Sequence, residues 1–490
     1  MAIGEDMIHL DRDAQTPLAD QIVMQLAGLI QKGHMPSGTR LPSIRKMAGE
    51  LLVSSATVVV AYDRLIARGL VESRASSGFF VAPQSAGAVR SPLIAQAPKY
   101  DAVSTLKQVM NRQDGVTPVS GGFLPESWLE DTLSSRRLAS IARQGKRAFV
   151  SSGCAEGYAP LRNQLAVKLA MMGIPTHEDQ ILMTFGVTHA CELICRALLS
   201  PGDAVVVDEP GYYGLYAQLG AHGARLLPVP RRSDGPDVDV LAEVCARFRP
   251  KLYFTQTLMN NPTGTSTGVP KAAEILRIAE RHDMLVIEDD IYGDLHPGNG
   301  AVRLAQLNRL QRVIFTSSFT KLLSPNIRVG YLTATPQLVE SFLAQKLLSV
   351  FTTSEFDERV VHAILADGGY RKHVERLKNR LAQQKPAIVK GLTEAGLTPL
   401  PQDHASVFVW ATLPQGIQPE VLVQDAAEHG FMLIPGSLFF VNAPESPWMR
   451  FNMGWANDKR LFQYFGQRLP ILQQLGTTDF QRTIRKGRVI

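Results

Sequence analysis

Lys321 is the residue of this sequence with the clearest capacity for chemistry. It follows Ser318-Phe319-Thr320 and, before them, the apolar run Val313-Ile314-Phe315. Because such a run is typical of a buried strand, we expect the lysine at the carboxyl end of that strand. Desolvation there lowers the pKa of a lysine, and the neutral amine can attack an aldehyde to form a Schiff base. Most lysines are surface charges. The surrounding motifs must therefore distinguish a Schiff-base lysine from an ordinary surface lysine.

Three other side chains could hold an aromatic ring beside that amine. Asp289 ends a second apolar run and could pair with a protonated ring nitrogen, and Asn261 could hydrogen-bond a ring hydroxyl. Tyr212, in Glu209-Pro210-Gly211-Tyr212, could stack on the ring. A carboxylate on a pyridine nitrogen preserves the ring as an electron sink.

A glycine turn could hold a phosphate. Gly186-Val187-Thr188 lies between a strand expected at residues 181–183 and a helix expected to begin near His189. Free backbone N–H groups and the helix dipole would then face an anion. The order and spacing of these motifs predict a site for pyridoxal 5'-phosphate, bound through Lys321.

The elements that must position these residues alternate between strand and helix. Apolar runs at residues 204–207, 252–254, 285–287 and 313–315 are separated by helical stretches. This alternation predicts an α/β domain with a mostly parallel sheet and helices on both faces. From about Thr335, longer helices and then a few strands indicate a smaller C-terminal α/β lobe.

Residues 16–82 contain their own set of helix-start and turn signals, which is typical of a separate small domain. Helices are expected after Thr16-Pro17, near Pro42-Ser43 and after Ser54-Ser55, and a two-stranded hairpin at residues 71–81. Three helices and a hairpin in so short a segment predict a winged helix-turn-helix. We therefore predict a DNA-binding domain at residues 10–82, a linker at 83–101, a large domain at 102–473 and a basic tail at 474–490, expected to be disordered.

Composition limits the remaining classes. The chain has 490 residues, 45% hydrophobic and 20% charged, with a formal charge of +6, and no apolar run long enough to span a bilayer. Its N-terminus carries acids where a signal peptide would be basic, so we expect a cytoplasmic protein with no membrane association. Four cysteines without a C-x-x-C pair argue against a disulfide framework or a structural zinc site, and no metal is predicted.

From about Gly121 to Gln467 the motifs resemble the fold-type I, class I aminotransferases. The resemblance implies Lys321 as the Schiff-base lysine and Arg450 as the residue that takes the carboxylate of a substrate. A salt bridge to a neighbouring acid is the alternative for Arg450. It also implies cofactor contacts by Asp289 on the pyridine nitrogen, Tyr292 and Asn261 on the ring hydroxyl, Tyr212 on the ring face, and Gly186, Val187, Thr188, Ser318 and Arg328 on the phosphate.

Two positions depart from that family. Ser152 stands where a tyrosine normally reaches the phosphate of the neighbouring subunit, and Gln402 to Ser406 replace a Pro-x-Gly-Gly turn. Cofactor binding could survive both changes, whereas efficient transamination is put in doubt.

The segment from Pro36 to Leu70 resembles the GntR-type winged helix-turn-helix, and its combination with an aminotransferase-like domain resembles the MocR subfamily of bacterial regulators. The resemblance implies DNA contacts by Arg45, Ser54, Thr57 and the wing glycine Gly78. Ser55 replaces an arginine usual in the family, which implies a different operator or weaker binding. A winged helix used for protein contacts is the alternative.

Two functions follow as hypotheses. The first is a homodimeric transcriptional regulator that binds double-stranded promoter DNA and senses pyridoxal phosphate, alone or with a small amino compound as an aldimine. The second is a working aminotransferase in which the DNA-binding domain is of minor importance.

Overall fold

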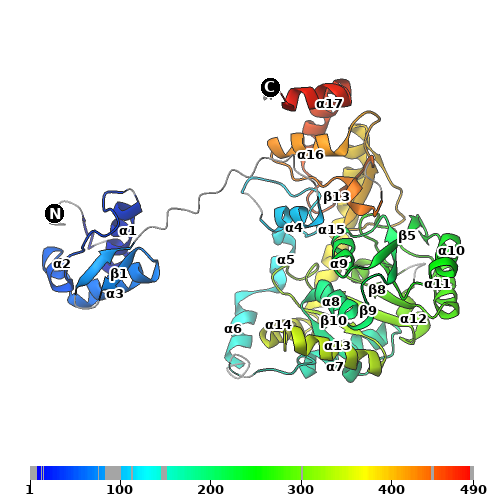
Figure 1. Cartoon of the computed structure of the whole chain (residues 1–490), viewed down its shortest axis with the longest axis horizontal. Coiled ribbons are helices and arrows are strands. Elements are labelled where there is room, and N and C mark those ends of the chain that lie inside the picture. Colours follow the sequence, from blue (N-terminus) through cyan, green and yellow to red (C-terminus); the bar gives the residue numbers. More distant parts are fainter. Residues whose placement is uncertain are drawn as a thin grey trace. The chain divides into compact units, whose positions relative to one another are not determined.

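The computed structural model describes residues 8–82 and 101–485, apart from 13, 15, 32, 75–76, 112–113, 145–149, 151, 299–301 and 443–445. The chain divides into two compact units, Met1–Lys99 and Tyr100–Ile490 (Figure 1). The linker predicted at 83–101 lies outside the described residues except for Asp101. The exact domain bounds given above remain predictions.

The described residues of the first unit form three helices and a hairpin. The helices are α1 (Leu18–Gln31), α2 (Ile44–Glu50) and α3 (Ser55–Ala67), and the antiparallel strands are β1 (Val71–Arg74) and β2 (Gly78–Val81). Leu26, Met47, Tyr62 and Leu65 are among the residues of a separate apolar core, so this unit buries its own interior. The predicted winged helix-turn-helix is confirmed.

An eight-stranded sheet forms the centre of the second unit, in the order β3-β10-β9-β8-β7-β4-β5-β6. Strands β4, β5, β7, β8 and β9 pair in parallel, and β10 is antiparallel to both of its neighbours. The strands are β3 (Ile181–Thr184), β4 (Ala204–Glu209), β5 (Arg225–Arg232), β6 (Gly235–Pro236), β7 (Leu252–Thr255), β8 (Leu285–Asp289), β9 (Val313–Ser318) and β10 (Gly330–Thr333). The predicted mostly parallel sheet is confirmed.

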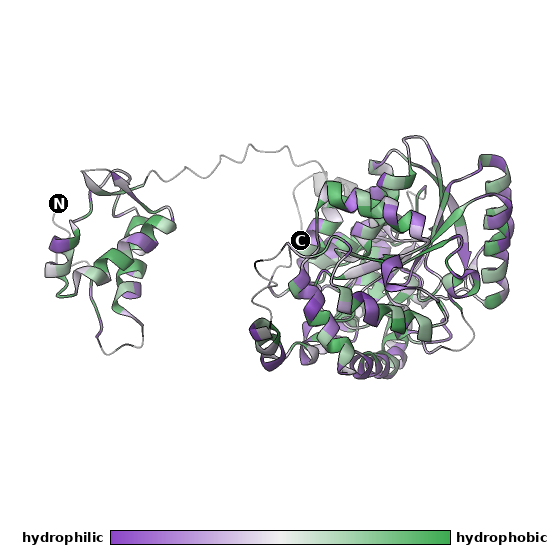
Figure 2. Cartoon of the chain, turned by 90° about the horizontal axis from the view of Figure 1, so that it is seen from below, coloured by the Kyte–Doolittle hydropathy of each residue, from purple (hydrophilic) through white to green (hydrophobic). Residues whose placement is uncertain are grey.

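Both faces of this sheet are covered. Alternate residues of each strand point to opposite sides, and each side packs into its own apolar cluster. Val206 packs into one core cluster, whereas Val205 and Val207 pack into the other. Helices α8 (Gly186–Leu198), α9 (Tyr213–Ala221) and α13 (Pro336–Ser349) supply apolar residues to the second cluster. The helices of the unit show alternating hydrophobic and hydrophilic bands, as expected for elements with one buried side (Figure 2).

The remaining helices support the first cluster or the C-terminal lobe. They are α4 (Ala102–Met110), α5 (Glu126–Leu129), α6 (Ser135–Gln144), α7 (Ala159–Met171), α10 (Val238–Phe248), α11 (Val269–Arg281), α12 (Leu304–Asn308), α14 (Glu355–Ala366), α15 (Gly369–Glu394), α16 (Pro419–Glu428) and α17 (Lys459–Arg485). A three-stranded antiparallel sheet, β11 (Thr398–Pro399), β12 (Phe408–Thr412) and β13 (Trp448–Asn452), completes the lobe. Helix α17 extends into the segment predicted as a basic tail, and no side chain beyond Gln474 is described.

Among the described residues, no helix is both long enough and apolar enough to cross a bilayer.

Candidate functional site

A cavity of about 420 Å³ lies at the edge of the large sheet where the parallel strands end. In parallel strands the carboxyl ends meet at one edge, so the residues that follow β3, β4, β7, β8 and β9 converge there. Arg328 reaches the same edge because it precedes β10, which runs in the opposite direction. The lining includes every residue predicted to contact the cofactor or a carboxylate: Gly186, Val187, Thr188, Tyr212, Asn261, Asp289, Tyr292, Ser318, Lys321, Arg328 and Arg450.

The Lys321 amine is held in an environment that disfavours its charge. Its Nζ lies 3.7 Å from the centre of the Phe123 ring, and no described residue supplies a hydrogen-bond acceptor to it. Burial, followed by the positive charges of Arg450 and Arg328, lowers the pKa of Lys321 to about 7, against the opposing effect of Asp289. A substantial fraction of this amine is therefore neutral and nucleophilic near pH 7.

Asp289 ends strand β8 and is held by two donors. Its carboxylate accepts a hydrogen bond from Gln256 Nε2 at 2.8 Å and another from the backbone N–H of Ile291 at 3.1 Å. Burial raises the pKa of Asp289 to about 7 despite these donors. A buried carboxylate of this kind gains stability from a cationic partner, such as a protonated ring nitrogen.

The turn from β3 into α8 forms a cradle for an anion. Helix α8 begins at Gly186, three residues before the predicted start near His189, so Gly186, Val187 and Thr188 form its first turn. The N–H groups of a first turn have no partner within the helix, and no side chain caps this one. Gly186 has a φ of +75°, and a Cβ there would lie 3.2 Å from Arg328 Nη2. Glycine therefore keeps the space between the helix start and a guanidinium open.

Ser318 and Arg328 border this cradle in different ways. Ser318 Oγ donates to the backbone oxygen of Val329 and is also bonded to Thr320 Oγ1 at 2.8 Å. Arg328 is exposed, and its Nη2 donates to the backbone oxygen of Phe185 at 3.3 Å. The guanidinium thus stands at the mouth of the cavity beside the N-terminus of α8.

Arg450 is a buried cation without an acidic partner. It is 1% exposed, and its guanidinium lies between the rings of Phe408 and Phe439 at 4.5 and 4.8 Å. Its Nη1 donates to Asn261 Oδ1 at 2.7 Å, and its Nε has no partner in the part of the chain that the structure describes. No carboxylate among the described residues pairs with it, which leaves the predicted alternative of a salt bridge without support there. A buried, unneutralised guanidinium is suited to a bidentate contact with the carboxylate of a ligand.

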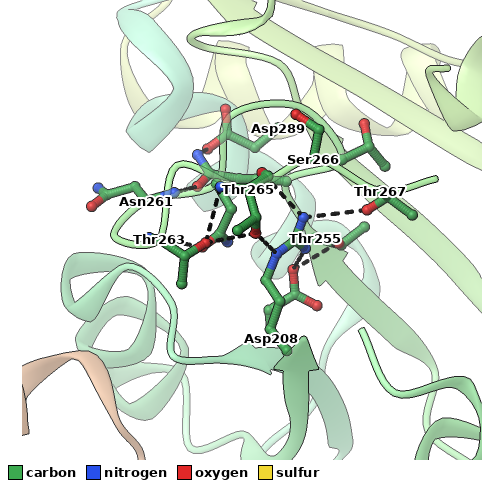
Figure 3. Close-up of polar contacts among 12 residues, drawn as sticks. Asp208, Thr255, Asn261, Thr263, Thr265, Ser266, Thr267 and Asp289 are labelled. Carbon is green, nitrogen blue, oxygen red and sulfur yellow. Dashed lines mark hydrogen bonds and ion pairs between the residues drawn. The ribbon is translucent and has the colours of Figure 1, made fainter. Parts of the chain in front are cut away.

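A buried ion pair fixes the loop that carries Asn261. Asp208 accepts hydrogen bonds from Arg231 Nη1 at 2.8 Å and from Thr255 Oγ1 at 2.8 Å. The same guanidinium donates to Thr265 and Thr267 on the far side of that loop (Figure 3). The network ties the end of β4 to the loop between β7 and α11, and thereby positions Asn261.

Several lining residues were not predicted from the sequence. Phe123 has no local signal, because it follows a glycine pair outside any apolar run. Gln256 directly follows β7, so the rule that ligands bind at strand carboxyl ends could have assigned it a place. Leu106, Val109 and Met110 of α4 form an apolar wall that could be recognised only once the fold had placed that helix.

In the first unit, the predicted DNA-contacting residues lie on two helices and the hairpin. Ser54 caps α3, with its Oγ 3.1 Å from the backbone N–H of Thr57 and 2.8 Å from the Thr57 hydroxyl. Ser55 and Arg45 are exposed at the starts of α3 and α2. Gly78 begins β2 with a φ of +102°, a conformation that favours glycine.

Comparisons with known proteins agree with both units. Residues 119–464 match the family described as aminotransferase class I and II, and residues 18–81 match the gntR family of bacterial regulatory proteins. The chain is 28% identical over 459 residues to the probable rhizopine catabolism regulatory protein MocR of Rhizobium meliloti, covering 89% of this chain and 90% of that one. It is 28% identical over 353 residues to the 2-aminoadipate transaminase of Thermus thermophilus, covering 69% and 86%.

A solved structure extends the likeness. The α-aminoadipate aminotransferase LysN of Thermus thermophilus, complexed with N-(5'-phosphopyridoxyl)-L-leucine, superposes with a TM-score of 0.69 at 27% identity. The match covers 76% of this chain and 97% of that one.

Proposed function

Because the chain belongs to the aminotransferase class I and II family and carries a GntR-family domain at its N-terminus, we propose that it is a pyridoxal phosphate-dependent regulator of transcription. Its first unit binds double-stranded promoter DNA, and its second unit binds the cofactor and a small amino compound. The observation that carries the proposal is a single cavity that combines Lys321, Asp289 and Arg450 in a chain with a helix-turn-helix.

The residues present fit the cofactor group by group. The uncapped start of α8 and Arg328 suit its phosphate, Asp289 its ring nitrogen, and Lys321 its aldehyde carbon. When bound, pyridoxal phosphate supplies an electron sink for a bond broken at the α-carbon of an amino compound. Tyr212 would cover the ring of the bound group, and Asn261 and Tyr292 would hydrogen-bond its ring hydroxyl.

The cavity also favours one class of amino compound. Arg450, with an unpartnered Nε, would hold the α-carboxylate, while Leu106, Val109 and Met110 offer an apolar wall. The cations among the lining residues are Lys321, Arg328 and Arg450. In this proposal they are used by the aldehyde carbon, the phosphate and the α-carboxylate, respectively. A second carboxylate would therefore be desolvated without compensation, so the ligand is an amino acid with an apolar side chain.

L-Leucine should bind the cofactor-loaded protein at least tenfold more tightly than L-aspartate, as followed by titration of the visible absorbance.

The regulator acts as a cytoplasmic homodimer, since its DNA target lies in the cytoplasm and its family resemblance implies a dimer. Leu348 and Phe351, at the end of α13, are 83% and 73% exposed and would be covered by a second copy. Sedimentation of the purified chain should give twice the chain mass, and Phe351→Lys should shift it toward the monomer.

Absorbance spectroscopy tests the cofactor half of the proposal. The purified chain with added pyridoxal phosphate should show a visible band that borohydride abolishes, leaving the group covalently attached at Lys321. Lys321→Ala should lack that attachment, while Lys346→Ala, which removes another buried lysine outside the cavity, should retain it. No band in the native chain would overturn cofactor binding.

Catalytic transamination is a second candidate function, because Lys321, Asp289 and Arg450 together could hold an amino acid and move a proton at its α-carbon. Incubation of the loaded protein with L-leucine and a different 2-oxo acid, which accepts the amino group and restores the aldehyde form of the cofactor, distinguishes the two functions. Multiple turnovers of 2-oxo acid per chain would identify an aminotransferase, whereas binding without turnover supports the regulator.

A further inference from the structure

The exposed face of α3 is apolar at the place where a helix-turn-helix meets DNA. Val58, Ala61, Tyr62 and Leu65 point into the core of the first unit. On the opposite face, Val59 and Val60 are 38% and 41% exposed, next to the exposed Ser55 and Ala56. The N-terminal half of such a helix is the part that contacts base edges in the major groove.

This face offers few hydrogen-bond donors for reading bases. The first basic residue of α3 is Arg64, whose guanidinium forms an ion pair with Asp20 of α1. The Ser54 and Thr57 hydroxyls are bonded to each other in the helix cap, 2.8 Å apart. The Ser55 hydroxyl is left as the exposed donor of the first turn, and the side chains that follow it carry methyl groups.

Cations flank the apolar face. Arg40, before α2, and Arg45 and Lys46, in its first turn, are exposed and can contact phosphates. Arg74 of the hairpin lies 4.5 Å from the centre of the Phe80 ring and forms an ion pair with Glu72 at 2.7 Å, so Arg40 and Arg45 supply the positive charge. The exposed Asp63 lies on the same face one turn beyond Val59 and Val60, so the apolar part of the face is its N-terminal half. Exposed cations beside this apolar half match a duplex groove, in which phosphates border base edges.

We propose that α3 recognises its operator chiefly by contact of Ala56, Val59 and Val60 with the C5-methyl groups of thymines. This inference rests on the proposed DNA-binding function. In the major groove of unmodified DNA, the thymine methyl is the apolar group that a base pair presents. An apolar helix face therefore selects thymine at two or more positions and has no means to select guanine by a bidentate contact.

In vitro selection from a random duplex library with the full-length, cofactor-loaded chain supplies the operator. Each thymine of the selected duplex is then replaced in turn by deoxyuridine, which removes only the methyl group. Binding should weaken about fourfold at each contacted thymine, the factor expected for loss of one buried methyl. Deoxyuridine outside the protected region is the control for altered duplex properties.

Variants connect the effect to individual side chains. Val60→Ala and Val59→Ala should each bind the thymine duplex more weakly and should lose the penalty for deoxyuridine at one particular position. Met24→Ala, which trims an exposed apolar side chain of α1, should retain every penalty. Circular dichroism of each variant shows whether the helices are intact.

The outcomes separate the inference from the function on which it rests. Failure to enrich any duplex overturns both the DNA-binding function and the readout. Enrichment of a duplex whose affinity is insensitive to deoxyuridine, or whose contacted positions are guanines, overturns the methyl readout and leaves DNA binding intact.

Discussion

At the scale of single residues, the charge of Lys321 depends on groups from three parts of the chain: Asp289 in β8, Arg450 in β13 and Arg328, which precedes β10. Burial and two guanidinium groups lower its pKa to about 7, whereas Asp289 opposes them. The rate at which the amine captures pyridoxal phosphate should therefore rise with pH, about tenfold per unit below pH 7, and level off above it, because only the neutral form reacts. Stopped-flow absorbance between pH 5.5 and 9 measures this profile.

Asp289→Asn tests whether this carboxylate favours the charged form of Lys321. Removing the carboxylate removes the group that favours the lysine cation, so the midpoint should move to lower pH. A midpoint near the ordinary lysine pKa of about 10.4 in the native chain would contradict the environment described for Lys321.

Arg231 stabilises the fold through its ion pair with the buried carboxylate of Asp208. Arg231→Met would leave the Asp208 carboxylate buried without its cation and should lower the free energy of unfolding by about 3–5 kcal/mol. The adjacent Arg232, paired with Asp237 and 64% exposed in its side chain, is the matched control. Arg232→Met should cost less than about 1 kcal/mol. Denaturant unfolding of the full chain compares them, and equal losses would show that Arg231 has no special role.

At the scale of elements, the turn between α2 and α3 stores strain at Leu52. This residue has a φ of +52° and is 74% exposed, so its side chain gains little from packing. Leu52→Gly should stabilise the first unit by roughly 0.5–1 kcal/mol. Glycine removes the steric cost of this conformation, and that gain exceeds the larger chain entropy that glycine loses on folding. Leu52→Ala, which keeps the Cβ, should show no such gain. Hydrogen exchange of the α3 amides in the full chain measures the difference.

Elements with a strong local pattern could be predicted from the sequence. The run Val205-Val206-Val207 could be identified as a buried strand, and Ser54 as a helix cap, because neighbouring residues alone specify those states. The start of α8 was misplaced by three residues, since Gly186 has a left-handed φ that helical periodicity does not reveal. Phe123 could not be assigned to the site, because its position beside Lys321 depends on contacts between distant parts of the chain.

At the scale of the whole molecule, the two units must influence each other for the protein to regulate. A ligand shifts an equilibrium only by its difference in affinity for the two states. Helix α4 is the first element after residues 83–100, and its Leu106, Val109 and Met110 line the cavity. An amino acid that packs against this wall therefore contacts the element nearest in sequence to the DNA-binding unit.

Thermodynamic linkage makes this coupling measurable from either end. If L-leucine changes the Kd for the selected operator by some factor, a saturating operator must change the Kd for L-leucine by the same factor, typically about 5- to 150-fold. Anisotropy of a labelled duplex gives the first factor, and absorbance titration of the cofactor-loaded chain gives the second. A scrambled duplex of equal length controls for nonspecific charge effects.

Met110→Ala should reduce both factors equally if the α4 wall carries the coupling, because one free energy underlies both measurements. A variant that weakens L-leucine binding while leaving both factors unchanged would place the coupling elsewhere in the chain.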